Sequence, residues 1–278
     1  MRTIPAQDVI DAVAAAAIDA NYALGEDVVR AVEKALDAES SPAGRDVLAQ
    51  ILENARIARQ GKLPLCQDTG LAVLFVELGE DVRVEGGLNA ALTGGVRKGC
   101  ADGYLRNGVC DPFSRENTGD NTPAVIHVDV VPGDRLVIDF LAKGGGSENM
   151  SRACVLPPAA GEEGVIGYAA DVVRAGAVNA CPPVTVGLGI GGDLELAAKL
   201  AKKALTRPLG EPSGDARLAR IEAAALERIN RLGIGPAGLG GSTTALAVHA
   251  AAAPCHIASL PVAVVLECHA HRHRRIEL

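Results

Sequence analysis

The chain has 278 residues and a formal net charge of −7, and 48% of its residues are apolar, so it can bury a sizeable core. This acidic balance, without a basic stripe, argues against nucleic acid as a partner. Aromatic residues make up only 2% of the chain, which disfavours stacking on bases or sugars as the main activity. No stretch reaches 18 consecutive apolar residues, so the sequence predicts no membrane span.

The predicted elements of the first half follow hydrophobic periodicity. They are helices over 7–59 with a break at 40–43, a buried strand at 71–78, a helix over 86–105, a polar loop at 106–123, and strands at 124–131 and 135–142. The sequence Pro132-Gly133-Asp134 between the last two strands is typical of a hairpin turn.

The second half continues the alternation of helices and strands. Its predicted elements are a helix over 163–179, a strand at 183–190, a helix over 193–206, a surface loop at 207–216, a helix over 217–232, a glycine-rich segment at 233–241 and a strand around 258–266. The polar ending, His271–Arg275, is typical of a solvated tail. The mixture predicts an α/β fold with α+β character, in which mixed β-sheets are flanked by helices.

The N-terminus lacks the order of regions that defines a signal peptide, so we expect a cytoplasmic protein with reduced thiols. Seven cysteines are an odd number, which excludes a complete disulfide framework. Three of them, Cys66, Cys181 and Cys268, adjoin breaking or polar residues and are predicted to lie in strand-end loops, where a scaffold usually places a site. By contrast, we expect Cys100, Cys110 and Cys154 to pack as small buried hydrophobes.

The three loop cysteines leave two metal interpretations open. Their wide separation resembles none of the compact iron–sulfur runs, but three thiolates would leave one iron of a [4Fe–4S] cluster open as a Lewis acid. Zinc would instead take four ligands, and soft or borderline ligands occur in Cys255-His256 and in Cys268-His269-x-His271-x-His273. His256 could instead be a core histidine whose hydrogen bonds are made within the fold, with no role in a site.

Glycine motifs and one arginine add weaker signals. Gly144, Gly145 and Gly146 could cradle an anion with successive N–H groups, or form a flexible turn. Gly187-x-Gly-x-Gly-Gly follows a strand, but its spacing differs from that of the dinucleotide fingerprint. Arg106 could clamp a carboxylate, or be an ordinary surface residue.

Taken together, these segments give the chain a family resemblance. The chain resembles the iron–sulfur region of class I fumarases and the related tartrate dehydratases, in the family's order and over nearly its whole length. The matching stretches are Pro64-Leu-Cys-Gln-Asp-Thr-Gly, Ala142-Lys-Gly-Gly-Gly-Ser-Glu-Asn, Cys181-Pro-Pro-Val-Thr-Val-Gly-Leu-Gly-Ile-Gly-Gly, Gly235-Pro-Ala-Gly-Leu-Gly-Gly-Ser-Thr-Thr-Ala-Leu, and Pro254-Cys-His-Ile-Ala-Ser-Leu-Pro-Val-Ala through Cys268-His.

The resemblance implies a site and a chemistry. Cys66, Cys181 and Cys268 would hold a [4Fe–4S] cluster on strand-end loops, with one iron open to the substrate. The implied catalytic residues are Asp68 and His256. The residues that would line the substrate pocket are Gln67, Asp68, Arg106, Gly144, Gly145, Gly146 and His256.

The resemblance also implies a missing partner. The family's general base is a threonine in a separate C-terminal region, and no equivalent segment occurs in this sequence. We therefore expect residues 1–278 to form a single cluster-binding catalytic domain of the class I fumarase α type. A β subunit would supply the base, in an α2β2 hetero-oligomer.

The leading expectation is a hydro-lyase that reversibly dehydrates (S)-malate to fumarate. Dehydration of tartrate to oxaloacetate is the nearest alternative, because one substrate hydroxyl separates the two reactions. A non-catalytic iron–sulfur or zinc protein, acting as a sensor or scaffold, is an alternative of another class.

Overall fold

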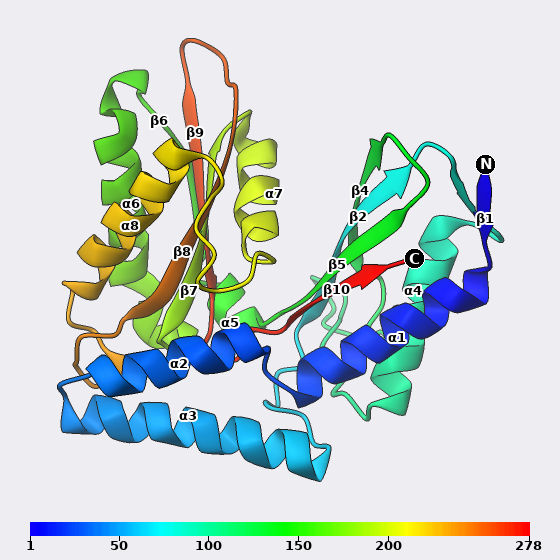
Figure 1. Cartoon of the computed structure of the whole chain (residues 1–278), viewed down its shortest axis with the longest axis horizontal. Helices are drawn as coiled ribbons and strands as arrows, with labels where there is room; N and C mark the ends of the chain where they lie inside the picture. Colours follow the sequence, from blue (N-terminus) through cyan, green and yellow to red (C-terminus); the bar gives the residue numbers. More distant parts are fainter. The chain divides into compact units, whose positions relative to one another are not determined.

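The computed structural model describes all 278 residues, whose backbone contacts divide into two compact units. The first unit comprises Met1–Gly25, Ala55–Gly145 and Arg272–Leu278, and the second comprises Glu26–Asn54 and Gly146–His271 (Figure 1). Whether residues 1–278 act as one catalytic domain stays a prediction. None of the helices is both long and apolar enough to cross a lipid bilayer.

The first unit is built on a four-stranded mixed sheet in the order β10-β5-β2-β4. Its strands are β2 (Leu71–Gly79), β4 (Val125–Val131), β5 (Leu136–Lys143) and β10 (His273–Glu277). Strand β5 is buried at every position, whereas every position of the edge strand β4 is partly buried or exposed. A small parallel pair, β1 (Arg2–Ile4) and β3 (Val82–Val84), completes the unit's strands.

Two helices, α1 (Ala6–Tyr22) and α4 (Leu88–Asp102), pack against each other beside this sheet (Figure 1). Glycines on α4 allow a close approach to α1. A Cβ on Gly95 would lie 2.6 Å from the Cβ of Val13, and one on Gly99 would lie 2.8 Å from the carbonyl oxygen of Ala14. The apolar faces of both helices therefore join the sheet in one core.

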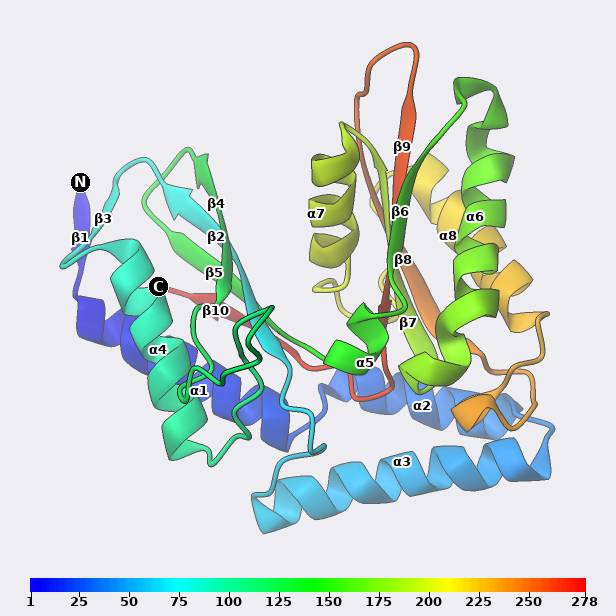
Figure 2. The same ribbon diagram turned by 180° about the vertical axis from the view of Figure 1, so that it is seen from behind.

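The second unit is built on another four-stranded mixed sheet, in the order β6-β9-β7-β8. Its strands are β6 (Arg152–Leu156), β7 (Val184–Gly191), β8 (Ala245–Ala253) and β9 (Leu260–Glu267). Helix α7 (Leu194–Ala204) covers one face, and α6 (Gly161–Gly176) and α8 (Ala216–Asn230) cover the other (Figure 2). Most of the core of this unit lies between the sheet and the α6–α8 pair.

The glycine motif at the end of β7 serves this packing. A Cβ on Gly187 would lie 2.0 Å from the carbonyl oxygen of Ala201, and one on Gly189 would lie 1.9 Å from that of Ala197. The absence of side chains at these positions lets α7 rest directly on the strand. The motif is thus explained by a helix–sheet contact.

Helices α2 (Glu26–Ala38) and α3 (Pro42–Gly61) follow α1, and one of the points where the chain passes between the two units falls within α3. The short helix α5 (Gly145–Glu148) follows β5, and three 3-10 turns lie at Pro158–Ala160, Ala177–Ala180 and Pro236–Gly238. Residues 205–215, between α7 and α8, contain neither helix nor strand.

The predicted α/β fold with mixed sheets and flanking helices is confirmed. The predicted hairpin at residues 132–134 is wrong, because β2 lies between β4 and β5. Instead, the turn after β2 forms hydrogen bonds with the segment that connects β4 to β5. The N–H groups of Gly79, Glu80 and Asp81 donate to the carbonyl groups of Arg135, Val131 and Gly133, respectively.

The predicted solvated tail at His271–Arg275 is also wrong. The side chains of His271 and Arg272 are buried, and the following residues form β10, which pairs with β5. The positive charges in the strand are neutralised locally, because Arg274 pairs with Asp19 and Arg275 pairs with Asp139.

Candidate active site

Cys66 lies in a loop of the first unit, which we name the Cys66 loop (residues 62–70) and which joins α3 to β2. The thiol is partly exposed. The N–H of Asp68 donates to Cys66 Sγ at 3.4 Å, and the thiol in turn donates to Gln67 Oε1 at 3.3 Å. The sulfur therefore has polar neighbours and is accessible to a ligand.

Asp68 fixes the conformation of this loop through both of its carboxylate oxygens. Oδ1 accepts the N–H of Gly70 at 2.9 Å, and Oδ2 accepts the N–H of Gly145 at 2.8 Å. Gly70 has a φ of 76°, and a Cβ there would lie 2.8 Å from the backbone of Ala142. Asp68 thus connects the Cys66 loop to the Gly144–Gly146 segment after β5.

Arg106 lies beside the same loop. Its carbonyl oxygen accepts hydrogen bonds from Thr69 Oγ1 at 2.7 Å and Asn121 Nδ2 at 3.1 Å, while the residue itself is exposed. The first unit therefore brings together Cys66, Gln67, Asp68, Gly145 and the backbone of Arg106. Sequence reasoning gave no role to Thr69 and Asn121, which hold Arg106 in place.

Cys181 and Cys268 lie near each other in the second unit. Cys181 precedes β7 and Cys268 follows β9, and these strands are antiparallel with Thr185 opposite Glu267. The N–H of His269 donates to the carbonyl oxygen of Cys181 at 3.3 Å. The Nδ1 of His269 lies 3.0 Å from the same oxygen, so it carries the proton of a second hydrogen bond. Two of the three predicted ligands thus occur at one end of one sheet.

Cys181 has the backbone conformation that usually requires glycine, with φ 55° and ψ 70°. A residue other than glycine is strained in this left-handed conformation by about 1–3 kcal/mol, and such strained residues cluster at functional sites. The thiol of Cys181 is exposed. An exposed thiol held in a strained conformation is suited to ligation.

His256 lies at the opposite end of the same sheet. It belongs to the connection between β8 and β9, whereas Cys181 and Cys268 lie where β7 begins and β9 ends (Figure 1). Eight residues of β9 separate the two ends, which is about 25 Å. His256 is exposed, so the alternative of a core histidine is wrong. Its Nδ1 accepts the N–H of Ala258 at 3.2 Å.

Two of the C-terminal histidines contact backbone carbonyl groups. His271 Nε2 lies 2.9 Å from the carbonyl oxygen of Leu205, and His269 contacts that of Cys181. No three side chains of His, Cys, Asp or Glu converge as they would around a metal ion. Cys100, Cys110 and Cys154 are partly buried, and Cys100 packs against the core of the first unit.

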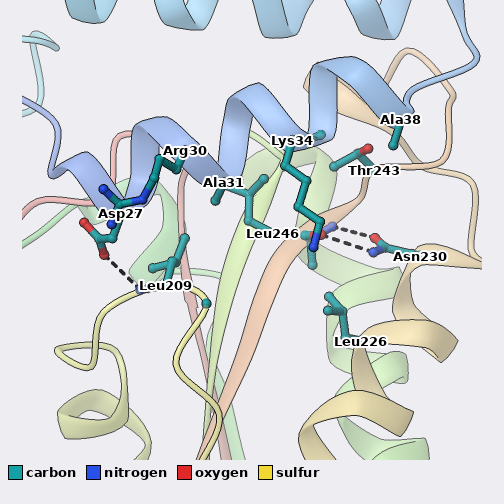
Figure 3. A pocket seen from close by; sticks show the side chains of 13 residues that line it. Asp27, Arg30, Ala31, Lys34, Ala38, Leu209, Leu226, Asn230, Thr243 and Leu246 are labelled. Atoms are coloured by element: carbon teal, nitrogen blue, oxygen red, sulfur yellow. Dashed lines mark hydrogen bonds between the residues drawn. The ribbon is translucent and has the colours of Figure 1, made fainter.

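A cleft of about 380 Å³ in the second unit contains none of the predicted site residues (Figure 3). It lies along α2, whose Arg30 and Lys34 line it. Asp27 Oδ2 accepts the N–H of Leu209 there at 2.9 Å, and Asn230 binds the backbone of Ala245. The Asp27 contact ties α2 to Leu209, whereas the Asn230 contact joins α8 to β8.

Glu39, after α2, holds the glycine-rich loop at residues 235–244. Its carboxylate accepts the N–H groups of Ser242 and Thr243 at 2.9 Å, and also that of Ser41 at 3.0 Å. The N–H of Ala237 in this loop donates to the carbonyl oxygen of Pro182, next to Cys181. Burial raises the pKa of the Glu39 carboxyl, but these hydrogen bonds outweigh burial and lower the pKa from 4.5 to about 2.

This low pKa predicts an acid-dependent loss of stability. The contribution of Glu39 is fully present above pH 4.5 and is lost as the pH falls from 4.5 towards 2. Between pH 6 and pH 3, the free energy of unfolding of the wild-type chain should fall by about 2 kcal/mol more than that of Glu39→Gln. Urea titrations at the two pH values measure the difference. Equal losses in both proteins would contradict the role given to Glu39.

Comparison with known proteins identifies the protein family to which this fold and these cysteine-bearing segments belong. The chain belongs to the fumarate hydratase (Fumerase) family, whose model matches residues 10–277. It is therefore a hydro-lyase, and the resemblance stated from the sequence motifs is confirmed.

Particular relatives are tartrate dehydratase subunits. The chain is 40% identical to the "Putative L(+)-tartrate dehydratase subunit alpha" of Methanocaldococcus jannaschii, over 92% of this chain and 93% of that protein. It is 37% identical to the L(+)-tartrate dehydratase subunit alpha of Escherichia coli strain UTI89, and 36% identical to that of strain K12. Each alignment with the E. coli proteins covers 89% of this chain and 83% of the relative. The designation of these relatives as α subunits fits the expected need for a β subunit.

Proposed function

We propose that this chain is the iron–sulfur α subunit of a hydro-lyase that acts on a four-carbon hydroxydicarboxylate. Cys66, Cys181 and Cys268 would hold a [4Fe–4S] cluster, which supplies a Lewis acid when it is bound. The observation that carries the proposal is the hydrogen bonding of His269 to the carbonyl oxygen of Cys181, which places two of the three cysteine segments together. The accessible thiols and the strained backbone of Cys181 fit such a group.

The residues of the first unit would bind and orient the substrate. Arg106 offers an exposed guanidinium, which suits a substrate carboxylate. Gln67 and the Gly144–Gly146 segment offer further hydrogen-bond donors for the charge that develops as the α-proton leaves. Asp68 already accepts the N–H of Gly145, so its role would be to orient this segment beside the β subunit's base.

His256 requires a second copy of the chain if it binds the same substrate. The sheet of its own chain keeps it about 25 Å from Cys181 and Cys268, which is beyond the reach of a side chain. This separation supports the α2 part of an α2β2 assembly, in which the His256 of one α subunit serves the site of the other.

Two substrates remain as candidates. (S)-Malate, with fumarate as product, agrees with the name of the family. Tartrate, with oxaloacetate as product, agrees with the names of the relatives at 36–40% identity. The two differ by one hydroxyl, which a site can select by a single hydrogen bond.

Anaerobic reconstitution with iron and sulfide tests the cluster and the reaction together. The wild-type chain should bind about four irons and four sulfides and, only after addition of a β subunit, should dehydrate malate or tartrate. Cys66→Ser, Cys181→Ser and Cys268→Ser should each lose the cluster spectrum and turnover. Cys255→Ser is the matched control, because Cys255 is an exposed thiol next to His256 and outside the proposed ligand set.

Three other outcomes would contradict the proposal. Normal clusters in all three variants would refute the ligand set. Stoichiometric zinc without sulfide would favour the sensor or scaffold. Rapid turnover by the α chain alone would refute the need for a β subunit.

A further inference from the structure

Arg272 is the largest side chain that is fully buried, with an exposed fraction of 1%. A guanidinium remains charged under all ordinary conditions, and burying a charge without a partner of opposite sign is strongly unfavourable. The buried charge of Arg272 therefore requires a compensating interaction.

The hydrogen bonds of Arg272 are all to neutral groups. Its guanidinium donates to Asn21 Oδ1 at 2.9 Å and to the carbonyl oxygen of Asp68. Asn21 directs its oxygen there because its own amide donates to the carbonyl oxygen of Ala17 at 2.9 Å. The buried Nε–H of Arg272 has no acceptor. By contrast, Arg274 and Arg275 on the following strand, β10, each pair with a carboxylate.

These contacts fix the Cys66 loop on both sides of the cysteine. The N–H of Leu65 donates to the carbonyl oxygen of Asn21 at 2.8 Å, and Arg272 binds the carbonyl oxygen of Asp68. Arg272 is itself held to β5, because its carbonyl oxygen accepts the N–H of Ala142 at 3.0 Å. The pair of Asn21 and Arg272 thus anchors the segment that carries Cys66.

We propose that Arg272 is a positioning residue that holds Cys66 in the conformation required for ligation, and whose charge is balanced by the cluster and its thiolates. This inference rests on the proposed function. Three thiolates outweigh the positive charge of the [4Fe–4S] core, so the group is an anion. Arg272 follows Cys268 by four positions, so one short segment carries both a ligand and this cation.

The experiment compares Arg272→Met and Arg272→Lys with the wild-type chain, and uses Arg274→Met as the matched control on β10. Hydrogen exchange of residues 65–70 in the chain without cluster tests the anchor. Loss of a hydrogen bond from a charged group should accelerate exchange there about 10- to 100-fold in Arg272→Met, and less in Arg272→Lys. Arg274→Met should leave exchange at residues 65–70 unchanged.

The reduction potential of the reconstituted cluster tests the charge. Removal of a nearby cation disfavours the reduced state, so Arg272→Met should lower the potential, while Arg272→Lys should stay near the wild-type value. A purely structural role would shift both variants alike.

Wild-type exchange at residues 65–70 in Arg272→Met, or an unchanged potential in it, would overturn the inference. If Arg272→Met does not fold, Arg272→Lys still decides the anchor, because it must show faster exchange at residues 65–70 than the wild type. A wild-type chain that takes up no cluster would refute the proposed function and the charge balance, while the exchange measurement would still decide whether Arg272 anchors the loop.

Discussion

Replacement of Gly189 by alanine should destabilise the second unit by at least about 3 kcal/mol, or prevent it from folding. The new Cβ would lie 1.9 Å from the carbonyl oxygen of Ala197 and within 3 Å of two other backbone atoms of α7. The backbone of a packed helix cannot rotate away as the end of a side chain can. Helix α7 would have to leave the face of β7, which would open part of the core. Urea denaturation followed by circular dichroism measures the loss.

Gly214→Ala is the matched control, because a Cβ at Gly214 meets nothing within 4 Å. Its free energy of unfolding should stay within about 0.5 kcal/mol of the wild-type value. If Gly189→Ala and Gly214→Ala unfolded at the same urea concentration, the direct contact between α7 and β7 would be wrong.

Replacement of Asp68 by asparagine should lower the turnover of the complete α/β enzyme by about 10²-fold, the cost of a small misplacement of the groups that orient a substrate. Each oxygen of Asp68 accepts a backbone N–H, from Gly70 and from Gly145. An amide group would place a donor against one of these donors, so the Cys66 loop or the Gly144–Gly146 segment must move. Steady-state rates and iron content, measured on the same samples, separate lost chemistry from a lost cluster.

Asp215→Asn is the control for this substitution. Asp215 also accepts two backbone N–H groups, but with one oxygen and at the start of α8, where asparagine serves equally well. Turnover should be unchanged in Asp215→Asn. Wild-type turnover in Asp68→Asn would show that Asp68 has no role in the active site.

Periodicity predicted the helices and most central strands, because local burial patterns depend on neighbouring residues alone. It failed where pairing is decided at long range. The turn after β2 binds residues 131–135, and nothing in Pro132-Gly133-Asp134 indicates this. Strand β8, Ala245–Ala253, is rich in alanine and contains Val248 as its only β-branched residue, so its sequence gave no strand signal.

In the candidate site, too, the sequence indicated the local features but not the long-range contacts. Motifs around Cys66, Cys181 and Cys268 indicated the important loops, because glycine, proline and polar residues interrupt apolar strands there. The anchor formed by Asn21 and Arg272 joins residues 251 positions apart, and the arginine occurs in a run that is typical of a solvated surface. The position of His256 depends on which strands are antiparallel, which the sequence alone does not specify.

The last strand, β10, has a consequence for the order of folding. Residues 272–278 complete the first unit, yet they are synthesised after all of the second. Until they arrive, the strand β5 has an open edge beside Leu136, where the N–H and C=O of Leu278 later pair. An open apolar edge is prone to pair with other chains. Early collapse of residues 146–271 would shorten the effective loop and reduce the entropy lost when β10 docks. We therefore expect the second unit to form first and the first unit to close last.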